Sequence, residues 1–244
     1  MLLTIYFWSL SVVSLLSTFF TCLIFYPFVD QKTFSRTYEL LTGGIMLYIM
    51  SPIWKLTVKD KRKDKSWSYE VKGEKKDKQF IIIANHMSFI DSLITVVIPV
   101  KKKFMIGKTF TKAPVFGWLT LKSGFVPAEK GNPEVNKHAV EKAIETLKDG
   151  CSFQIYPEGQ RELTPYQFEK FKTGAFRIAS ETNLEILPIT INGAYEALRF
   201  RGIAGLANIV ISIDEPFKVK NDDYDFYIEK TKDIISSRLK KYSP

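Results

Sequence analysis

The first 29 residues contain no charged side chain, and this feature constrains the fold more than any other. The run 1–28 is rich in Leu, Phe, Ile and Val, and the first charged residue is Asp30. As an α-helix this run would be about 40 Å long, enough to cross a bilayer with tilt. A cleaved signal peptide fits less well, because no Lys or Arg precedes the apolar run and no small-residue cleavage site follows it. We therefore expect a membrane helix.

A second uncharged apolar run follows at 40–54, after the polar segment 30–39. As a helix it would be only about 22 Å long, which is short for a full crossing. Two arrangements are open: both runs cross the bilayer, or the pair forms a helical hairpin lodged in one leaflet. In either case residues 1–54 are predicted to form a two-helix membrane element, and residues 55–244 a separate domain.

The composition changes abruptly after residue 54, and the chain has a net charge of +9. Ten basic residues lie in the next stretch: Lys55, Lys59, Lys61, Arg62, Lys63, Lys65, Lys72, Lys75, Lys76 and Lys78. A basic cluster beside a membrane segment predicts binding to anionic membrane lipid, and places this side of a cell membrane in the cytoplasm. Nucleic acid is not expected as a partner, because these lysines follow an apolar anchor and are not interleaved with stacking aromatics.

The rest of the chain alternates between predicted strands and helices. Strands are expected at 54–59, 67–72, 80–84, 104–106, 125–126, 152–156, 185–191 and 207–213, and helices at 92–97, 116–121, 132–149, 168–180 and 224–239. This alternation predicts an α/β fold, with a central, mostly parallel or mixed β-sheet flanked by helices. The N-terminal two-helix membrane-embedded element would precede that domain.

Cysteine and histidine are both scarce. Cys22 and Cys151 have no further cysteine or histidine at metal-ligand spacing, so no metal and no cofactor are predicted. The chain has two histidines, of which His138 lies on the polar side of the 132–149 helix and receives no role. Histidine chemistry would therefore fall to His86.

The segment 85–91, Asn-His-Met-Ser-Phe-Ile-Asp, leaves a buried strand and opens a helix. If His86 lies in the turn and Asp91 in the first helical turn, the carboxylate can reach back to the imidazole. That contact holds one ring nitrogen protonated and leaves the other as a base. The alternative is a helix-capping Asp beside a hydrogen-bonded turn His.

Two more segments follow strand 152–156. In 156–161 a Pro-Glu-Gly turn presents Glu158 and Arg161, and the arginine is suited to gripping a phosphate. In 171–175, Phe-Lys-Thr-Gly-Ala, the glycine permits close backbone approach. Each segment alone could equally be structural: a surface turn with an ordinary ion pair, and a helix-packing glycine.

Taken together, the order and spacing of these segments resemble the glycerolipid acyltransferase family, in particular the 1-acylglycerol-3-phosphate (lysophosphatidate) acyltransferases. The family pattern N-H-x-S-x-x-D is matched in full at 85–91, and F-K-x-G-A at 171–175. Further similarity lies at 157–161 (Gln160 replacing the usual Ser or Thr), at 124–130 (Lys130 replacing the usual Arg), at 186–189, and at Lys108, Pro114, Gly117 and Trp118. The resemblance covers about residues 70–215.

This resemblance implies transfer of a fatty acyl group from an acyl thioester to the 2-hydroxyl of lysophosphatidate, making phosphatidate. The donor would be acyl carrier protein or acyl-CoA. His86 would be the general base and Asp91 would orient it, while Lys108, Lys130 and Arg161 would bind the substrate phosphate. Asn85, Ser88, Glu158 and Gly159 would support the site.

Other functions remain open on the sequence. The same chemistry could act on glycerol 3-phosphate or another lysolipid. A membrane-bound thioesterase or lipid hydrolase would use Ser88 as its nucleophile, although no Gly-x-Ser-x-Gly elbow surrounds that serine. A membrane-tethered binding protein without catalysis is a third alternative.

Overall fold

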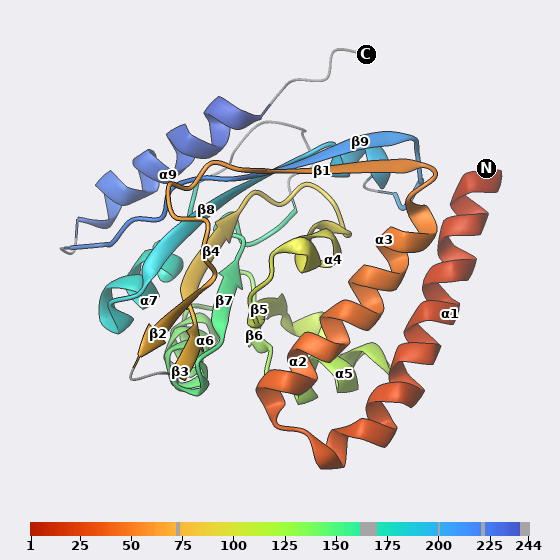
Figure 1. The fold of residues 1–244 in the computed structure, drawn as a ribbon, viewed down its shortest axis with the longest axis horizontal. Coiled ribbons are helices and arrows are strands. Elements are labelled where there is room, and N and C mark those ends of the chain that lie inside the picture. The colour runs from red at the N-terminus through yellow and green to blue at the C-terminus, as the bar shows by residue number, and fades with distance from the viewer. Residues whose placement is uncertain (72–73, 162–169, 200, 221–222, 240–244) are drawn as a thin grey trace.

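The computed structural model describes residues 1–71, 74–161, 170–199, 201–220 and 223–239 (Figure 1). Within these residues seven strands form one mixed sheet in the order β1-β9-β8-β4-β7-β5-β6. Its members are β1 (Trp54–Asp60), β4 (Phe80–Ala84), β5 (Lys102–Gly107), β6 (Val126–Ala128), β7 (Ser152–Ile155), β8 (Glu185–Asn192) and β9 (Ala207–Ile213). The β8–β9 pair is antiparallel and the other neighbours are parallel, so the expected α/β class with a mixed sheet is confirmed.

Strand β4 lies in the middle of the sheet and is buried on both faces. Phe80, Ile82 and Ala84 pack into one apolar cluster, and Ile81 and Ile83 into another. Side chains alternate across a strand, and a parallel strand covered on both faces therefore reads as a continuous apolar run. This is why the sequence Phe-Ile-Ile-Ile-Ala has no polar alternation.

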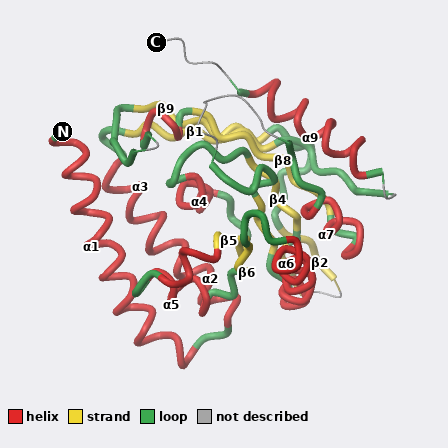
Figure 2. Tube along the Cα trace, turned by 180° about the vertical axis from the view of Figure 1, so that it is seen from behind, coloured by secondary structure: helices red, strands yellow, loops and turns green. Residues whose placement is uncertain are grey.

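Helices cover both faces of the sheet (Figures 1 and 2). One face is covered by α6 (Pro133–Thr146), α7 (Gly174–Thr182) and α9 (Tyr224–Arg238). The other face is covered by α3 (Ile45–Met50), α4 (Asp91–Ile94), α8 (Ala194–Ala197) and the first part of α1 (Leu2–Phe25). Helix α5 (Phe116–Lys122) packs against α1 and α2 (Gln31–Glu39). Short turns η3 (Thr95–Val97), η4 (Lys108–Lys112) and η5 (Leu147–Asp149) complete these connections.

The second N-terminal helix differs from its prediction. The segment 30–39, expected to be a polar connection, is helical: Asp30 caps α2 by accepting hydrogen bonds from the backbone and the hydroxyl of Thr33, both at 2.9 Å. The helix continues through a π-helical turn η2 (Leu40–Gly44) into α3 and ends at Met50. Trp54, predicted both to end the membrane element and to begin a strand, is the first residue of β1, so the predicted start of the strand is confirmed.

Helix α1 lies along the domain over its whole length. Near its N-terminus the Phe7 and Trp54 rings lie 5.6 Å apart, and near its C-terminus Phe19 lies 5.5 Å from Trp118. The turn η1 (Tyr26–Phe28) then links it to α2. In the described residues this is the one helix long and apolar enough to cross a membrane, at Leu2–Phe28.

The basic segment that follows β1 leads away from α1. It includes the small antiparallel pair β2 (Ser68–Val71) and β3 (Glu74–Asp77), which lies at the opposite end of the molecule from α1 (Figures 1 and 2). Arg62, expected to face lipid, is buried against Asp60 and lies over the Trp67 ring. The structure therefore separates the β2–β3 part of the cluster from α1, whereas Lys55 directly follows Trp54, whose ring lies 5.6 Å from Phe7 of that helix.

The predicted helix at 168–180 begins later than expected. Residues 168 and 169 lie outside the described residues, and α7 starts at Gly174. Phe171 is fully buried, but it lies before the helix, and the Lys172 backbone N–H donates to the Pro157 carbonyl at 2.9 Å. The apolar periodicity of 168–180 thus includes a core residue from the preceding loop.

Candidate active site

The turn after β4 brings His86 and Asp91 together. Nδ1 of His86 lies 2.8 Å from Oδ2 of Asp91, the first residue of α4. The same oxygen accepts the backbone N–H groups of Met87 and Ser88, both at 2.8 Å. The carboxylate therefore closes the turn that joins strand to helix, and it also binds the imidazole. This is how residues five apart in sequence meet.

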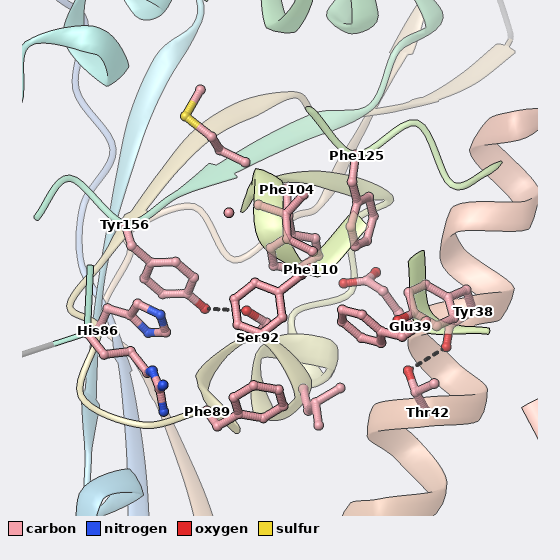
Figure 3. A pocket seen from close by; sticks show the side chains of 16 residues that line it. Tyr38, Glu39, Thr42, His86, Phe89, Ser92, Phe104, Phe110, Phe125 and Tyr156 are labelled. Carbon is pink, nitrogen blue, oxygen red and sulfur yellow. Dashed lines mark hydrogen bonds between the residues drawn. The ribbon is translucent and has the colours of Figure 1, made fainter. Parts of the chain in front are cut away.

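The contact between His86 and Asp91 determines which ring nitrogen of His86 carries the proton. An ionised carboxylate can only accept hydrogen bonds, so Nδ1 carries the proton and Nε2 of the neutral ring keeps its lone pair. Asp91 is fully buried, while His86 is partly exposed and lines a pocket (Figure 3). A histidine held by a carboxylate at the wall of a pocket is the arrangement that general-base catalysis uses.

Tyr156 supports the imidazole from one side. The two rings stack with centroids 4.2 Å apart and planes within 18°. The Tyr156 hydroxyl is 3.2 Å from Oγ of Ser92 and accepts a hydrogen bond from Gln154 at 3.0 Å. Burial, with a smaller contribution from Asp91, raises the pKa of Tyr156 well above 10, so its hydroxyl stays protonated. Tyr156 lies in the 156–161 segment, but no role was predicted for it from the sequence.

The four supporting residues lie around this pair. Asn85 bridges β4 to β8 through two hydrogen bonds with the Ile191 backbone, at 2.8 and 2.9 Å. Glu158 is buried and accepts the His86 backbone N–H at 3.4 Å. Gly159 has φ +71°, a left-handed conformation that favours glycine, and a side chain there would overlap Lys172.

Ser88 is not presented to the pocket. Its hydroxyl donates to the Leu198 carbonyl at 2.7 Å, and the residue is almost completely buried. Both cysteines are buried as well, and burial raises the pKa of the Cys151 thiol to about 12. These groups are poorly placed to act as nucleophiles, which disfavours the hydrolase alternative.

The three predicted phosphate-binding cations differ in their contacts and in whether they line the pocket. Arg161 lines the pocket with His86, and its guanidinium lies 5.5 Å from the Phe89 ring centre. Lys130 donates to the side chain of Gln160, next to Arg161 in the chain. Lys108 is paired with Glu129 at 3.1 Å, and both are about half exposed. Only Arg161 of the three is among the described residues that line the pocket.

The pocket extends from His86 between helix α2 and the sheet. Its lining is mostly apolar and aromatic, with Phe89, Leu93, Phe104, Met105, Ile106, Phe110, Phe116 and Phe125 along its walls. Its volume of about 150 Å³ is that of an engineered apolar cavity able to hold benzene. Tyr38, Glu39 and Thr42 lie at the end away from His86 and Tyr156 (Figure 3).

A buried ion pair at that end was not predicted. Oε1 of Glu39, from α2, lies 2.8 Å from Nζ of Lys102, the first residue of β5. Burial raises the pKa of Glu39 and lowers that of Lys102. The available signal was a run of lysines, Lys102 among them, that ends directly before the predicted strand 104–106. The partner could not be inferred, because it comes from a segment expected to be a polar connection.

Comparison with known proteins is consistent with this geometry. The Acyltransferase family model matches residues 62–192, more than half of the chain. A chloroplastic 1-acyl-sn-glycerol-3-phosphate acyltransferase of Arabidopsis thaliana is 28% identical over 142 residues, covering 57% of this chain and 40% of that protein. A 1-acyl-sn-glycerol-3-phosphate acyltransferase of Cocos nucifera is 30% identical over 148 residues, covering 59% and 47%. The chain thus matches less than half the length of these relatives.

The fold is also shared with a solved structure. The crystal structure of the 1-acyl-sn-glycerophosphate acyltransferase PlsC from Thermotoga maritima matches with a TM-score of 0.75 at 20% identity, covering 97% of this chain and 92% of that one. At this identity the likeness shows the fold alone. The family-model match spans both the His86–Asp91 turn and the 156–161 turn, and the chain therefore belongs to the acyltransferase family.

Proposed function

We propose that this protein transfers a fatty acyl group from an acyl thioester to the 2-hydroxyl of 1-acylglycerol 3-phosphate, making phosphatidate. The observation that carries the proposal is the His86–Asp91 pair opening onto an apolar pocket that also has Arg161 in its wall. Each feature suits one part of the substrates. The base would take the proton of the acceptor hydroxyl, the cation would bind the acceptor phosphate, and the apolar cavity would hold an acyl chain. The relatives with 1-acyl-sn-glycerol-3-phosphate acyltransferase names support this choice of acceptor.

In the proposed reaction Nε2 of His86 takes the proton of the acceptor hydroxyl as its oxygen attacks the thioester carbonyl. Asp91, holding Nδ1–H at 2.8 Å, stabilises the imidazolium that forms. Collapse of the tetrahedral intermediate forms the oxygen ester and releases the thiolate, which takes the proton back from His86. No acyl-enzyme is required, since the acceptor supplies the nucleophile.

Arg161 is proposed to anchor the acceptor phosphate, because it lines the same pocket as His86. A guanidinium binds a phosphate through two parallel hydrogen bonds and so fixes both position and orientation. Lys130, held near Arg161 through Gln160, would add charge. Lys108 already has Glu129 as a partner at 3.1 Å and would contribute least.

We further propose that α1 lies in one leaflet and does not cross the bilayer. A crossing helix has its two ends on opposite sides of the membrane, yet α1 contacts the domain through Phe7 near one end and Phe19 near the other. Its outer face is apolar and exposed. Residues 1–50 would then form the membrane-facing part, while the remaining residues form the catalytic domain on the cytoplasmic face.

The test is thiol release from acyl-CoA and from acyl carrier protein, with and without lysophosphatidate, in detergent micelles. We expect release that requires the acceptor and falls by 10²-fold or more in His86→Ala. His138→Ala is the matched control, because this second histidine is 77% exposed and should leave the rate unchanged. The two donors are compared in the same assay, which identifies the donor.

Other outcomes have distinct meanings. Release without any acceptor would show a thioesterase, and full activity in His86→Ala would remove the proposed base. A higher kcat/KM for glycerol 3-phosphate or another lysolipid would keep the chemistry and replace the acceptor.

A further inference from the structure

Charged side chains that pair with lipid headgroups beside α1 must come from outside the helix, because residues 1–29 contain no charged side chain. The basic segment after β1 does not supply them near α1, since it leads to the opposite end of the molecule. A different segment lies beside the N-terminal end of α1. This is the α8–β9 loop, which we define by its described residues Leu198, Arg199 and 201–206.

Hydrogen bonds hold this loop against α1 and β1. Nε1 of Trp8 donates to the Gly202 carbonyl at 2.8 Å, and the hydroxyl of Thr4 accepts the Ala204 backbone N–H at 3.2 Å. Nε1 of Trp54 donates to the Gly205 carbonyl at 3.0 Å. The loop is therefore fixed to α1 at two points and to the sheet at one.

Inside the loop the chain turns back on itself. The Gly202 N–H donates to the Arg199 carbonyl at 2.8 Å, and the Arg199 N–H donates to the Ile203 carbonyl at 3.0 Å. Gly202 adopts φ +75°, and a side chain there would press on the Trp8 indole. A tight turn of this kind presents its outer side chains in fixed directions.

Those outer side chains are apolar and basic. Ile203 is 46% exposed and Leu206 is 77% exposed. On α1, bonded to this loop, Leu2 and Ile5 are 81% and 55% exposed. Isolated exposed apolar residues are common, but a patch shared by two elements bonded to each other marks an interaction surface. Arg199 and Arg201, both exposed, flank the patch on the same loop.

We propose that the α8–β9 loop is a second membrane contact, with Ile203 and Leu206 entering the interface and Arg199 and Arg201 binding the phosphates of anionic lipids. Apolar side chains flanked by arginines, next to an interfacial tryptophan, are the composition of an interfacial anchor. This proposal rests on the one-leaflet placement of α1 proposed above.

The contact would also orient the active site. The carbonyl of Leu198, where the loop starts, accepts the hydroxyl of Ser88 at 2.7 Å. Ser88 belongs to the turn that Asp91 closes, and that turn holds His86. One buried hydrogen bond thus joins the membrane-facing loop to the catalytic turn. A loop anchored in the headgroup region would keep the pocket mouth at the bilayer surface, where an acceptor lipid resides.

The first test uses an environment-sensitive fluorophore on single cysteines in a Cys22→Ala, Cys151→Ala background. The labelled sites are Leu206→Cys in the loop, Val13→Cys on the outer face of α1, and Glu134→Cys on α6 as the control on the other sheet face. On addition of phosphatidylglycerol vesicles we expect a blue shift at 206 and 13 and none at 134. A silent label at 206 with a responding label at 13 would overturn the loop contact. If neither the label at 206 nor the label at 13 shifts its emission, the placement of α1 in the membrane is overturned.

The second test removes the two arginines. Vesicle flotation of the full chain compares Arg199→Gln/Arg201→Gln with Lys75→Gln/Lys76→Gln, a control that removes two exposed charges from β3. We expect the arginine pair to lower the affinity for vesicles containing phosphatidylglycerol by about fivefold per residue, and the lysine pair to lower it little. Phosphatidylcholine vesicles should not distinguish the variants. Equal losses for both pairs, or the same loss on neutral vesicles, would overturn the role of the arginines. Circular dichroism checks that each variant is folded.

Discussion

The ring of Tyr156 lies flat against the imidazole of His86, with centroids 4.2 Å apart. His86 is thus held on two sides, at its edge by the Asp91 carboxylate and on its face by the tyrosine. Tyr156 in turn is fixed by Ser92 and Gln154 through its hydroxyl. A base used in catalysis gains from such support, because a small displacement of the reacting groups costs rate.

Tyr156→Ala is predicted to lower kcat by about 10²-fold with a small change in the KM for lysophosphatidate, because the imidazole loses its stacking partner. Tyr156→Phe keeps the ring and loses the two hydroxyl contacts, so it should retain most of the rate. Steady-state kinetics of both variants measures the difference. If Tyr156→Phe loses as much activity as Tyr156→Ala, the hydroxyl is the important group and stacking is not.

Arg161→Lys is predicted to raise the KM for lysophosphatidate by roughly tenfold, because a lysine keeps the charge but loses the paired hydrogen bonds to a phosphate. Lys108→Gln should change that KM far less, since Lys108 is half exposed and already paired with Glu129. Acceptor titrations at saturating acyl donor compare the two. A larger effect at Lys108 would show that the phosphate lies on the Lys108–Glu129 side of the site.

The strands and the 85–91 turn were the most predictable parts of the fold. β9 has the bounds expected for it, and β4 was recognisable because a strand buried on both faces is a bounded apolar run. The meeting of His86 and Asp91 could also be proposed, since both follow a strand end within one turn of helix. These features depend on residues that are close in sequence.

Features that depend on distant segments could not be predicted. The start of α2 was missed for a different, local reason: Asp30 caps it through Thr33, but the polar composition of the segment favoured a connection. Its packing brings Glu39 to Lys102, a pair that no local pattern encodes. Likewise the contact between Trp8 and Gly202 joins the first helix to a loop far along the chain. Periodicity reports which face of an element is apolar, but not which element covers it.

The ionised carboxylate of Asp60 is predicted to stabilise the fold at neutral pH, and this contribution should be lost in acid. Burial of its carboxyl raises its pKa, but the Arg62 guanidinium, bonded to both carboxylate oxygens at 3.0 and 2.7 Å, outweighs this and leaves the pKa lowered. A pKa lower in the folded than in the unfolded state stabilises the fold above the unfolded value of about 3.9, and this stability is lost as pH falls through the folded value.

Asp60→Asn should therefore lower Tm at pH 7, and the gap from wild type should narrow below about pH 4. Thermal unfolding across this pH range measures it. Asp64→Asn is a useful comparison, because Asp64 is exposed and its contact with Lys78 should contribute little. A gap for Asp60→Asn that stays constant down to pH 3 would mean that packing, not charge, is responsible.

The Glu39–Lys102 pair leads to a prediction about both stability and substrate choice. Both side chains are almost completely buried, at 5% and 0% exposure. Glu39→Leu alone leaves the buried Lys102 ammonium without this carboxylate and is expected to destabilise the fold by about 3–5 kcal/mol. Lys102→Met should also destabilise it, although Glu39 then keeps its contact with Arg36 at 3.4 Å. The double variant removes both charges and should unfold near the wild-type denaturant midpoint, which chemical unfolding of the three variants measures.

Glu39 of this pair lines the apolar pocket at the end away from His86 (Figure 3). A hydrocarbon chain entering from the His86 end gains nothing by displacing a charged pair, so the pair sets the depth available to an acyl group. The folded double variant Glu39→Leu/Lys102→Met should therefore accept longer acyl chains, seen as a shift of kcat/KM toward longer thioesters at an unchanged KM for lysophosphatidate. Thr42→Ser, a small change at the same end, serves as the control that should leave the preference in place. An unchanged chain-length profile in a stable double variant would show that the acyl chain does not reach this end of the pocket.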